Sequence, residues 1–224
     1  MQFRPASDCS LLVYVGTDIG QAAHEDVLHL LHSVKGAQPS WLLNLQPAYC
    51  SVLVCFDPAQ ITHEQVETAI RSIANSSNRI PSTLPKAVEI PVCYGGEFGP
   101  DLEEAAKLLS LSLERIIEFH AAATYRASFL GFAPGFAYLG DVPAQLELPR
   151  LSTPRKKVPP GSIAIAGRQT AVYPFATPGG WRLIGRTPLT MFRADRDPMS
   201  LIGIGDQVRF RPITREEFLL LEQT

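Results

Sequence analysis

Residues 158–174 read VPPGSIAIAGRQTAVYP, and this stretch decides the fold of the larger part of the chain. Apolar residues, many of them β-branched, fill 162–166 and 169–173, with a glycine-containing turn between them. Two short runs of this kind predict a pair of β-strands. Further strands are expected at 87–93, 125–130, 181–184 and 207–210. The sequence after residue 80 therefore predicts a small β-barrel.

The loops of this region are rich in proline and glycine, which make up 17 of the 58 residues from 131 to 188. Such a density can signal disorder. The interleaved aromatic and β-branched residues favour ordered loops instead, because they supply the two faces of strands. Two short helices are expected before the later strands, one starting at Asp101 with Glu104 as a capping pair and one starting at Ser112.

The first 80 residues differ in composition, with only four of the 19 prolines and three of the 16 glycines. Apolar residues spaced i, i+3, i+4, i+7 predict two helices, and Thr62 with Gln65 predicts a capping box before the second. Strands are expected at 11–15, 41–45 and 49–56, and helices at 21–34 and 63–73. The order βαββα indicates a ferredoxin-like sheet.

We therefore expect an α+β protein with two domains, a ferredoxin-like domain at 1–80 and a β-barrel domain at 81–224. Between them, NSSNRIPSTLP at 75–85 has no periodic apolar stripe and predicts a linker.

Basic residues cluster in the barrel region. No Asp or Glu occurs from 148 to 194, so this stretch carries +8 and the rest of the chain −10, for a net charge of −2. Clustered cations attract anions and give paired donors for carboxylate or phosphate. A small anionic ligand, an acidic partner, a nucleic acid and a plain solvated surface all remain open. The eight residues are Arg150, Arg155, Lys156, Lys157, Arg168, Arg182, Arg186 and Arg193.

Three loops are the candidates for a binding site: FLGFAPGFAYLG at 129–140, the stretch at 158–174, and TPGGWRLIGRTPL at 177–189. Glycine lets backbone N–H groups approach a ligand, and aromatic side chains can wall a pocket. The same residues could equally shape turns and fill the barrel. The candidates are Gly135, Phe136, Tyr173, Gly179, Gly180 and Trp181.

Several function classes lack their signatures. The sequence has no G-x-S-x-G elbow, no phosphate loop and no strand-borne G-x-G-x-x-G. His29 and His32 share a helix face without further ligands, so we expect no metal site in this chain. The helix pair at 101–120 has the length of a helix-turn-helix, but its second helix is not basic, which argues against nucleic acid.

No stretch approaches the ~20 apolar residues of a membrane span, and 1–10 has no signal-peptide core. The four cysteines form no C-x-x-C pair. We expect a cytoplasmic protein that has free thiols and does not enter a membrane.

Several motifs occur together in one order: PVCYGGEFGPDL at 91–102, a helix ending in EFH at 118–120, and the three loops. In this combination the chain resembles the family of the 5-oxoprolinase B subunit, also called allophanate hydrolase subunit 1 or the sporulation kinase inhibitor family, a carboxyltransferase domain of the subunit 1 type. The resemblance is dense from 90 to 212 and weaker before 80. It implies a ferredoxin-like domain followed by a cyclophilin-like β-barrel.

The resemblance implies one of three activities: ATP-dependent opening of 5-oxoproline to glutamate, half of a biotin-dependent urea carboxyltransferase, or inhibition of a histidine kinase. We favour the first, a hydrolase in which a phosphoryl group activates the lactam. ATP is then the cofactor, with any Mg²⁺ carried on the nucleotide. The implied partner is a subunit of the C type (allophanate hydrolase subunit 2), alone or with a third 5-oxoprolinase subunit, and the chain should be inactive by itself.

Candidate roles follow from this resemblance. Arg155 and Arg186 are expected to anchor an anionic substrate. Arg168, which departs from the small residue or proline usual in the family, is expected in the substrate site. His120 shares a helix face with Leu113, so its ring lies in the core or in a pocket; we favour a pocket and a proton-handling or orienting role, because the family motif carries this histidine. The remaining substrate-binding candidates are Gln169 and Thr170 together with the six loop residues named above.

Limited proteolysis tests the domain boundary. Because 75–85 has no apolar stripe, a protease should cut between Asn75 and Lys86 and leave two stable fragments, identified by mass spectrometry. Preferred cleavage within 131–188 would show instead that the barrel loops are mobile.

Overall fold

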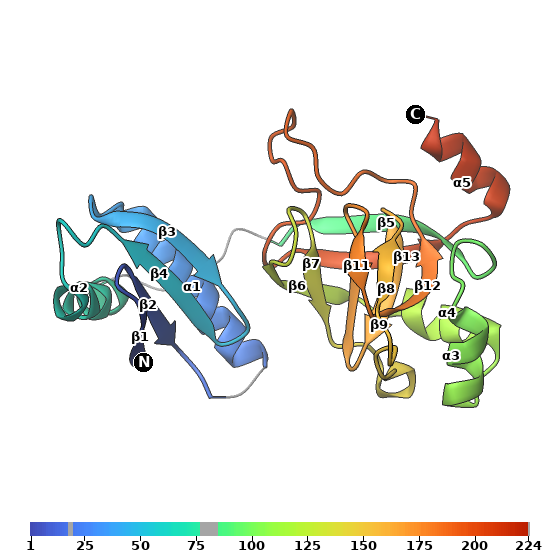
Figure 1. Ribbon diagram of the computed structural model, residues 1–224, viewed down its shortest axis with the longest axis horizontal. Coiled ribbons are helices and arrows are strands. Elements are labelled where there is room, and N and C mark those ends of the chain that lie inside the picture. Colours follow the sequence, from blue (N-terminus) through green and yellow to red (C-terminus); the bar gives the residue numbers. More distant parts are fainter. Residues whose placement is uncertain (18–19, 77–84, 224) are drawn as a thin grey trace. The chain divides into compact units, whose positions relative to one another are not determined.

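The computed structural model describes residues 1–17, 20–76 and 85–223, and the chain divides into two compact units, Met1–Leu84 and Pro85–Thr224 (Figure 1). Each unit has its own hydrophobic core. The expected domain boundary at residue 80 and most of the expected linker fall within 77–84, outside the described residues. No helix in the described part of the chain is both long and apolar enough to span a membrane.

The N-terminal unit is a four-stranded antiparallel sheet in the order β1-β2-β4-β3, with two helices packed against it (Figure 1). Its strands are β1 (Gln2–Ser7), β2 (Ser10–Tyr14), β3 (Leu42–Pro47) and β4 (Ser51–Phe56), and its helices are α1 (Gln21–Ala37) and α2 (His63–Ser76). The apolar stripes of both helices are buried on the sheet, as their spacing predicts. The buried residues include Val27, Leu30 and Val34 of α1, Val66 and Ile70 of α2, and Val13, Val52, Val54 and Phe56 of the sheet.

The sequence did not predict strand β1. Its residues, QFRPAS, are exposed except for the partly buried Phe3, so no buried apolar face marks it. β1 pairs only with β2, and an edge position tolerates its proline. The expected βαββα elements are confirmed, and β1 takes the edge beside β2 that the last strand takes in a ferredoxin-like βαββαβ sheet.

The C-terminal unit is a closed barrel in the order β10-β7-β6-β13-β5-β12-β9, which confirms the α+β class with a barrel. Neighbouring strands are antiparallel except β5 and β13, which are parallel. The strands are β5 (Ala87–Tyr94), β6 (Tyr125–Leu130), β7 (Ala137–Gly140), β9 (Ser162–Ala166), β10 (Gln169–Val172), β12 (Arg182–Arg186) and β13 (Gln207–Pro212). The helices are α3 (Leu102–Leu109), α4 (Leu113–Ala122), the short 3₁₀ helix η1 (Ala144–Leu146) and α5 (Arg215–Glu222).

A two-stranded ribbon of β8 (Arg155–Val158) and β11 (Thr177–Gly179) accompanies the barrel. It explains why every residue of β9, SIAIA, is buried. The two isoleucines, Ile163 and Ile165, belong to the main core, whereas Ala164 and Ala166 belong to a second cluster with Val158 of the ribbon. Because side chains alternate along a strand, β9 buries large residues on one face and small ones on the other.

Two of the three expected helix caps form. Thr62 and Gln65 make the reciprocal capping box, with Thr62 N–H donating to Gln65 Oε1 and Gln65 N–H donating to Thr62 Oγ1. Ser112 caps α4 by accepting from the N–H of Arg115. Asp101 was wrongly expected to cap α3; its side chain makes no cap hydrogen bond there.

Replacing Thr62 by Ala should destabilise α2 by about 1 kcal/mol, because the capping hydrogen bond at its N-terminus is lost. Hydrogen exchange of the α2 amides in the full chain measures this loss of helix stability. Thr68→Ala is the matched control, since Thr68 lies inside the same helix and alanine is the better helix former. Equal protection of α2 in both variants would contradict the cap.

Candidate anion-binding site

Phe136, Tyr173 and Trp181, three of the predicted residues, come together in the second cluster beside the ribbon. The Phe136 ring lies edge-on to Tyr173 and to Trp181, with centroid distances of 5.3 and 5.8 Å. All three side chains are buried. They form a packed floor beside the ribbon, not the open pocket walls that we expected.

Gly135 and Gly179 are needed for close packing of the protein against itself. A Cβ on Gly179 would lie 2.4 Å from the Tyr173 hydroxyl, and one on Gly135, which has a φ of +79°, would lie 2.7 Å from the Phe192 Cβ. Gly180 has ordinary space, because its Cβ would meet Pro154 at 3.5 Å. The close approach that we expected toward a ligand is thus made, for the first two glycines, to neighbouring side chains.

Arg155 extends from β8 to the buried carboxylate of Asp101, which accepts a hydrogen bond from its Nη2. The other oxygen of Asp101 accepts the N–H of Leu183 at 2.7 Å. Arg155 Nη1 is buried and has no hydrogen-bond acceptor among the described residues. Arg155 therefore combines a fixed orientation with unused donor capacity.

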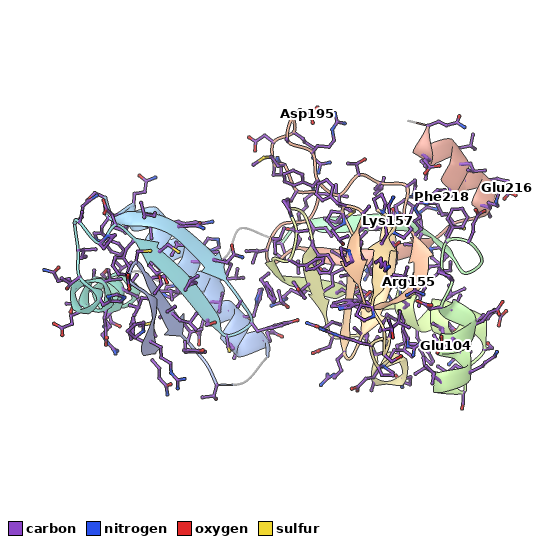
Figure 2. All side chains as sticks on the ribbon, viewed as in Figure 1. Glu104, Arg155, Lys157, Asp195, Glu216 and Phe218 are labelled. Carbon is purple, nitrogen blue, oxygen red and sulfur yellow. The ribbon has the colours of Figure 1, made fainter. Side chains whose placement is uncertain are left out.

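The basic stretch is acid-free only along the sequence. Nearby in space, Glu104 of α3 lies 3.0 Å from Arg182, whose Nε also donates to the Pro149 carbonyl. Figure 2 labels Arg155, Lys157 and Glu104 in this unit. The acidic side chains come from segments distant in sequence, so the charge count alone overstated the free positive charge.

Arg168 and Arg186 lie at opposite ends of β9, although we had expected both to bind one anionic substrate. Arg168 follows the C-terminal end of β9 and lies 3.5 Å from Asp141, and both side chains are exposed. Arg186 pairs in register with Ser162 at the other end of β9, about 13 Å away along the strand. Its Nε donates to the Pro160 carbonyl. Arg168 and Arg186 are therefore too far apart to hold one small anion together.

Three cations that we had not selected lie in the same part of the chain as Arg155. Lys156 and Lys157 are exposed on β8, and Arg150 is exposed with its guanidinium 6.0 Å from the Trp181 ring centre. The only sign of them in the sequence was the basic run itself. The structure then distinguishes the cations of this run that are paired with acids from those that are not. Side chains alternate along a strand, so Arg155 and Lys157 share one side of β8 and Lys156 takes the other. We call Arg150, Arg155 and Lys157 the basic ribbon face.

Tyr173 lies within the electrostatic reach of this face. Burial raises the pKa of its hydroxyl, while a backbone hydrogen bond from Trp181 and the charges of Arg150 and Arg155 oppose the rise. Cations beside an aromatic floor suit carboxylate or phosphate oxygens. The described residues include no group of three or more His, Cys, Asp or Glu placed to hold a metal ion.

His120 lies in the core of the barrel unit with no exposed surface. Its Nδ1 is 2.8 Å from the Tyr94 hydroxyl and its Nε2 is 3.0 Å from Thr170 Oγ1. Thr170 donates to the Ala164 carbonyl, so its oxygen accepts from Nε2–H, and Nδ1 accepts from Tyr94. The ring also stacks on Phe210 at 4.5 Å.

Burial keeps the imidazole in this chain of hydrogen bonds neutral. Burial lowers the pKa of His120 to about 3 and raises the pKa of Tyr94. The structure thus places His120 and Thr170 in the core, not in the pocket that we favoured. Gln169, which precedes Thr170 on β10, is partly exposed. Thr170 points to His120 because strand alternation turns it inward.

A known family and its members match this chain over most of its length. Residues 1–202 match the family described as "Carboxyltransferase domain, subdomain C and D". The chain belongs to this family. It is 38% identical to the 5-oxoprolinase B subunit of Bacillus subtilis over 97% of this chain and 95% of that protein. It is 53% identical to the protein of the same name in Escherichia coli O157:H7, over 56% of this chain and 57% of that one.

Solved structures share the fold. A conserved uncharacterized protein, PH0987 of Pyrococcus horikoshii, is 43% identical over 97% of this chain and all of that one, with a TM-score of 0.59. TTHA0988 is 34% identical with a TM-score of 0.81 over 91% of this chain; the match spans only 39% of that longer chain. The Kluyveromyces lactis urea amidolyase, at 18% identity and a TM-score of 0.80, matches 99% of this chain and 15% of its own and shows the fold alone.

The pH dependence of stability tests the neutral imidazole. An unfolded histidine binds its proton near pH 6.5, whereas the buried His120 does so only near pH 3. Between these values the unfolded state binds more protons, so stability is greatest above pH 6.5 and falls as the pH falls. The free energy of unfolding should drop by up to about 1.4 kcal/mol per pH unit from this residue.

Two variants isolate this contribution in urea unfolding at pH 7.5 to 4.5. His120→Gln should lose the extra slope. Thr170→Val keeps the buried imidazole, so it should keep the slope while being less stable at every pH. Identical slopes in wild type and His120→Gln would contradict the assignment.

Proposed function

We propose that this chain is a subunit of an ATP-dependent 5-oxoprolinase, which opens 5-oxoproline to glutamate together with a companion subunit of the C type. The observation that carries the proposal is the 38% identity to a 5-oxoprolinase B subunit over nearly the full length of both proteins. Identity over both units supports a shared role more strongly than likeness of one motif.

The basic ribbon face supports this role chemically. The substrate 5-oxoproline carries a carboxylate, and its lactam is an amide that water attacks only slowly. A guanidinium can hold the carboxylate through charge-assisted hydrogen bonds, and Arg155 has donors to spare. Lys157, on the same side of β8, is exposed and so can supply further positive charge. These side chains would bind and orient the substrate.

The same donor set fits the phosphate oxygens of ATP, which supplies the phosphoryl group that activates the lactam oxygen. The partly exposed guanidinium of Arg155 and the exposed Lys157 of β8 are the groups that would neutralise its charge. The described residues include no carboxylate cluster for Mg²⁺. In this proposal any Mg²⁺ is carried on the nucleotide phosphates.

An exposed apolar patch supports the companion subunit. Phe132, Phe175 and Met199 are 61%, 40% and 52% exposed. Phe192 links Phe175 to Met199, since it contacts the Phe175 ring at 5.8 Å and bridges to Ser200 beside Met199. The turn that carries Phe132 approaches Phe192 at Gly135, where an added Cβ would lie 2.7 Å from the Phe192 Cβ. Aromatic residues and methionine are enriched at protein interfaces. We define these four residues, Phe132, Phe175, Phe192 and Met199, as the aromatic patch.

Phe132 shows how the patch is presented. It adopts a φ of +68°, which is rare for a bulky residue. The turn around it is fixed by hydrogen bonds from Gly131 N–H to the Phe136 carbonyl and from Phe136 N–H to the Ala133 carbonyl. The longer chain of TTHA0988, of which this fold makes up 39%, supports further protein beside such a unit.

The test of function is 5-oxoproline-dependent ADP release, with glutamate measured alongside. The purified chain alone should release none, and mixing with a C-type subunit should restore release, because neither chain is expected to complete the site. Turnover by this chain alone would contradict the shared site. ADP release dependent on urea instead of 5-oxoproline would favour the carboxyltransferase alternative, and binding to a sensor kinase without turnover would favour the inhibitor.

The aromatic patch gives a matched pair for the complex. Phe132→Ser should weaken binding of the companion at least tenfold, since one buried aromatic anchor carries much of an interface. Leu43→Ser is the control, because Leu43 is 65% exposed on the N-terminal sheet. Equal affinities would place the companion on another surface.

A further inference from the structure

The strongest unexplained feature is the buried carboxylate of Asp101. It belongs to GPDL, where we expected a helix cap, and yet it caps nothing on α3. Its side chain is only 6% exposed. A buried charge is costly unless it is paired and hydrogen-bonded, so its position calls for a reason beyond helix initiation.

Asp101 is fixed on two sides. Its backbone N–H donates to the Leu183 carbonyl at 3.0 Å, and its Oδ2 accepts the Leu183 N–H at 2.7 Å. These paired bonds hold the start of α3 against β12, two residues after Trp181. The remaining oxygen, Oδ1, accepts a hydrogen bond from Arg155 Nη2.

Arg155 differs from the other arginines of the basic stretch. Arg182 is buried and its Nε is committed to a carbonyl, whereas Arg168 is exposed beside an exposed Asp141. Arg155 is 28% exposed and donates to Asp101 alone among the described residues. It pairs in register with Gly179, next to the Tyr173 hydroxyl.

We infer that Asp101 is a positioning residue, which holds the Arg155 guanidinium so that the exposed part of this group receives a carboxylate or phosphate oxyanion. The inference rests on the proposed function for its substrate, 5-oxoproline, but not for the anion site itself. Asp101 would touch no ligand and would act through Arg155 only. A fixed guanidinium binds an oxyanion better than a mobile one, because less side-chain freedom is lost on binding.

Calorimetry with two probes, inorganic phosphate and 5-oxoproline, tests this on the full chain and on its complex with the companion. Asp101→Asn keeps an acceptor for the Leu183 N–H and removes the charge that holds Arg155. It should weaken phosphate binding at least tenfold. Glu104→Gln is the matched control, since it breaks the neighbouring ion pair between Glu104 of α3 and Arg182 of β12. It should change phosphate binding less than twofold.

A double-mutant cycle separates positioning from general stability. If Asp101 acts through Arg155, then Asp101→Asn should have no further effect on phosphate binding in an Arg155→Ala background. In the assembled enzyme the same change should raise KM for 5-oxoproline and leave kcat within about twofold. Asp101→Glu, which restores the charge, should recover part of the affinity and also serves if the Asn variant does not fold.

Three results would overturn the inference: no binding of either probe by wild type in either state, equal losses in Asp101→Asn and Glu104→Gln, or additive effects in the cycle. Phosphate binding that depends on Asp101, in a complex that does not turn over 5-oxoproline, would uphold the anion site and overturn the proposed function alone.

Discussion

The hydrogen bonds of His120 are the contact on which the barrel unit depends. The ring ties the end of α4 to Tyr94 of β5 and to Thr170 of β10, and Tyr125 of β6 donates to its backbone carbonyl. Because every polar atom of this buried chain has a partner, the chain stabilises one arrangement of the strands. A proton on the ring would leave Nδ1 unable to accept from Tyr94, so the barrel requires the neutral form.

Asp101 connects the barrel to the ribbon at its surface. Helix α3, which it precedes, packs against α4, and the carboxylate joins β12 to the ribbon through Leu183 and Arg155. The basic ribbon face is thus held from inside, while the aromatic floor of Phe136, Tyr173 and Trp181 supports it from beside. His120 thus orders the core of the barrel, and Asp101 fixes the partly exposed Arg155.

The sequence was sufficient for elements whose side chains have one local role. Alternation revealed β9 and β10, helical spacing revealed α1 and α2, and the Thr62 capping box formed as its spacing requires. Strand β1 was not predicted, because an exposed edge strand needs no alternation of apolar and polar residues. Strand β8 of the ribbon was not predicted, because it begins with three cations, which are typical of a loop.

The site was harder to predict because its charges are paired over long distances along the chain. Asp101 and Glu104 reach Arg155 and Arg182, so an acid-free stretch of sequence became a partly neutralised surface. Likewise, Gly179 looked suited to a ligand, but the atom that approaches it is the Tyr173 hydroxyl. Local spacing does not contain such contacts.

Nitrogen NMR of the His120 ring tests the account most directly, since it observes the tautomer and its proton. The structure predicts a neutral ring protonated at Nε2 whose signals stay unchanged from pH 7.5 to pH 5, because burial lowers its pKa to about 3. A ring that is protonated at Nδ1, or that titrates near pH 6.5, would contradict the central claim that the neutral His120 holds the barrel together.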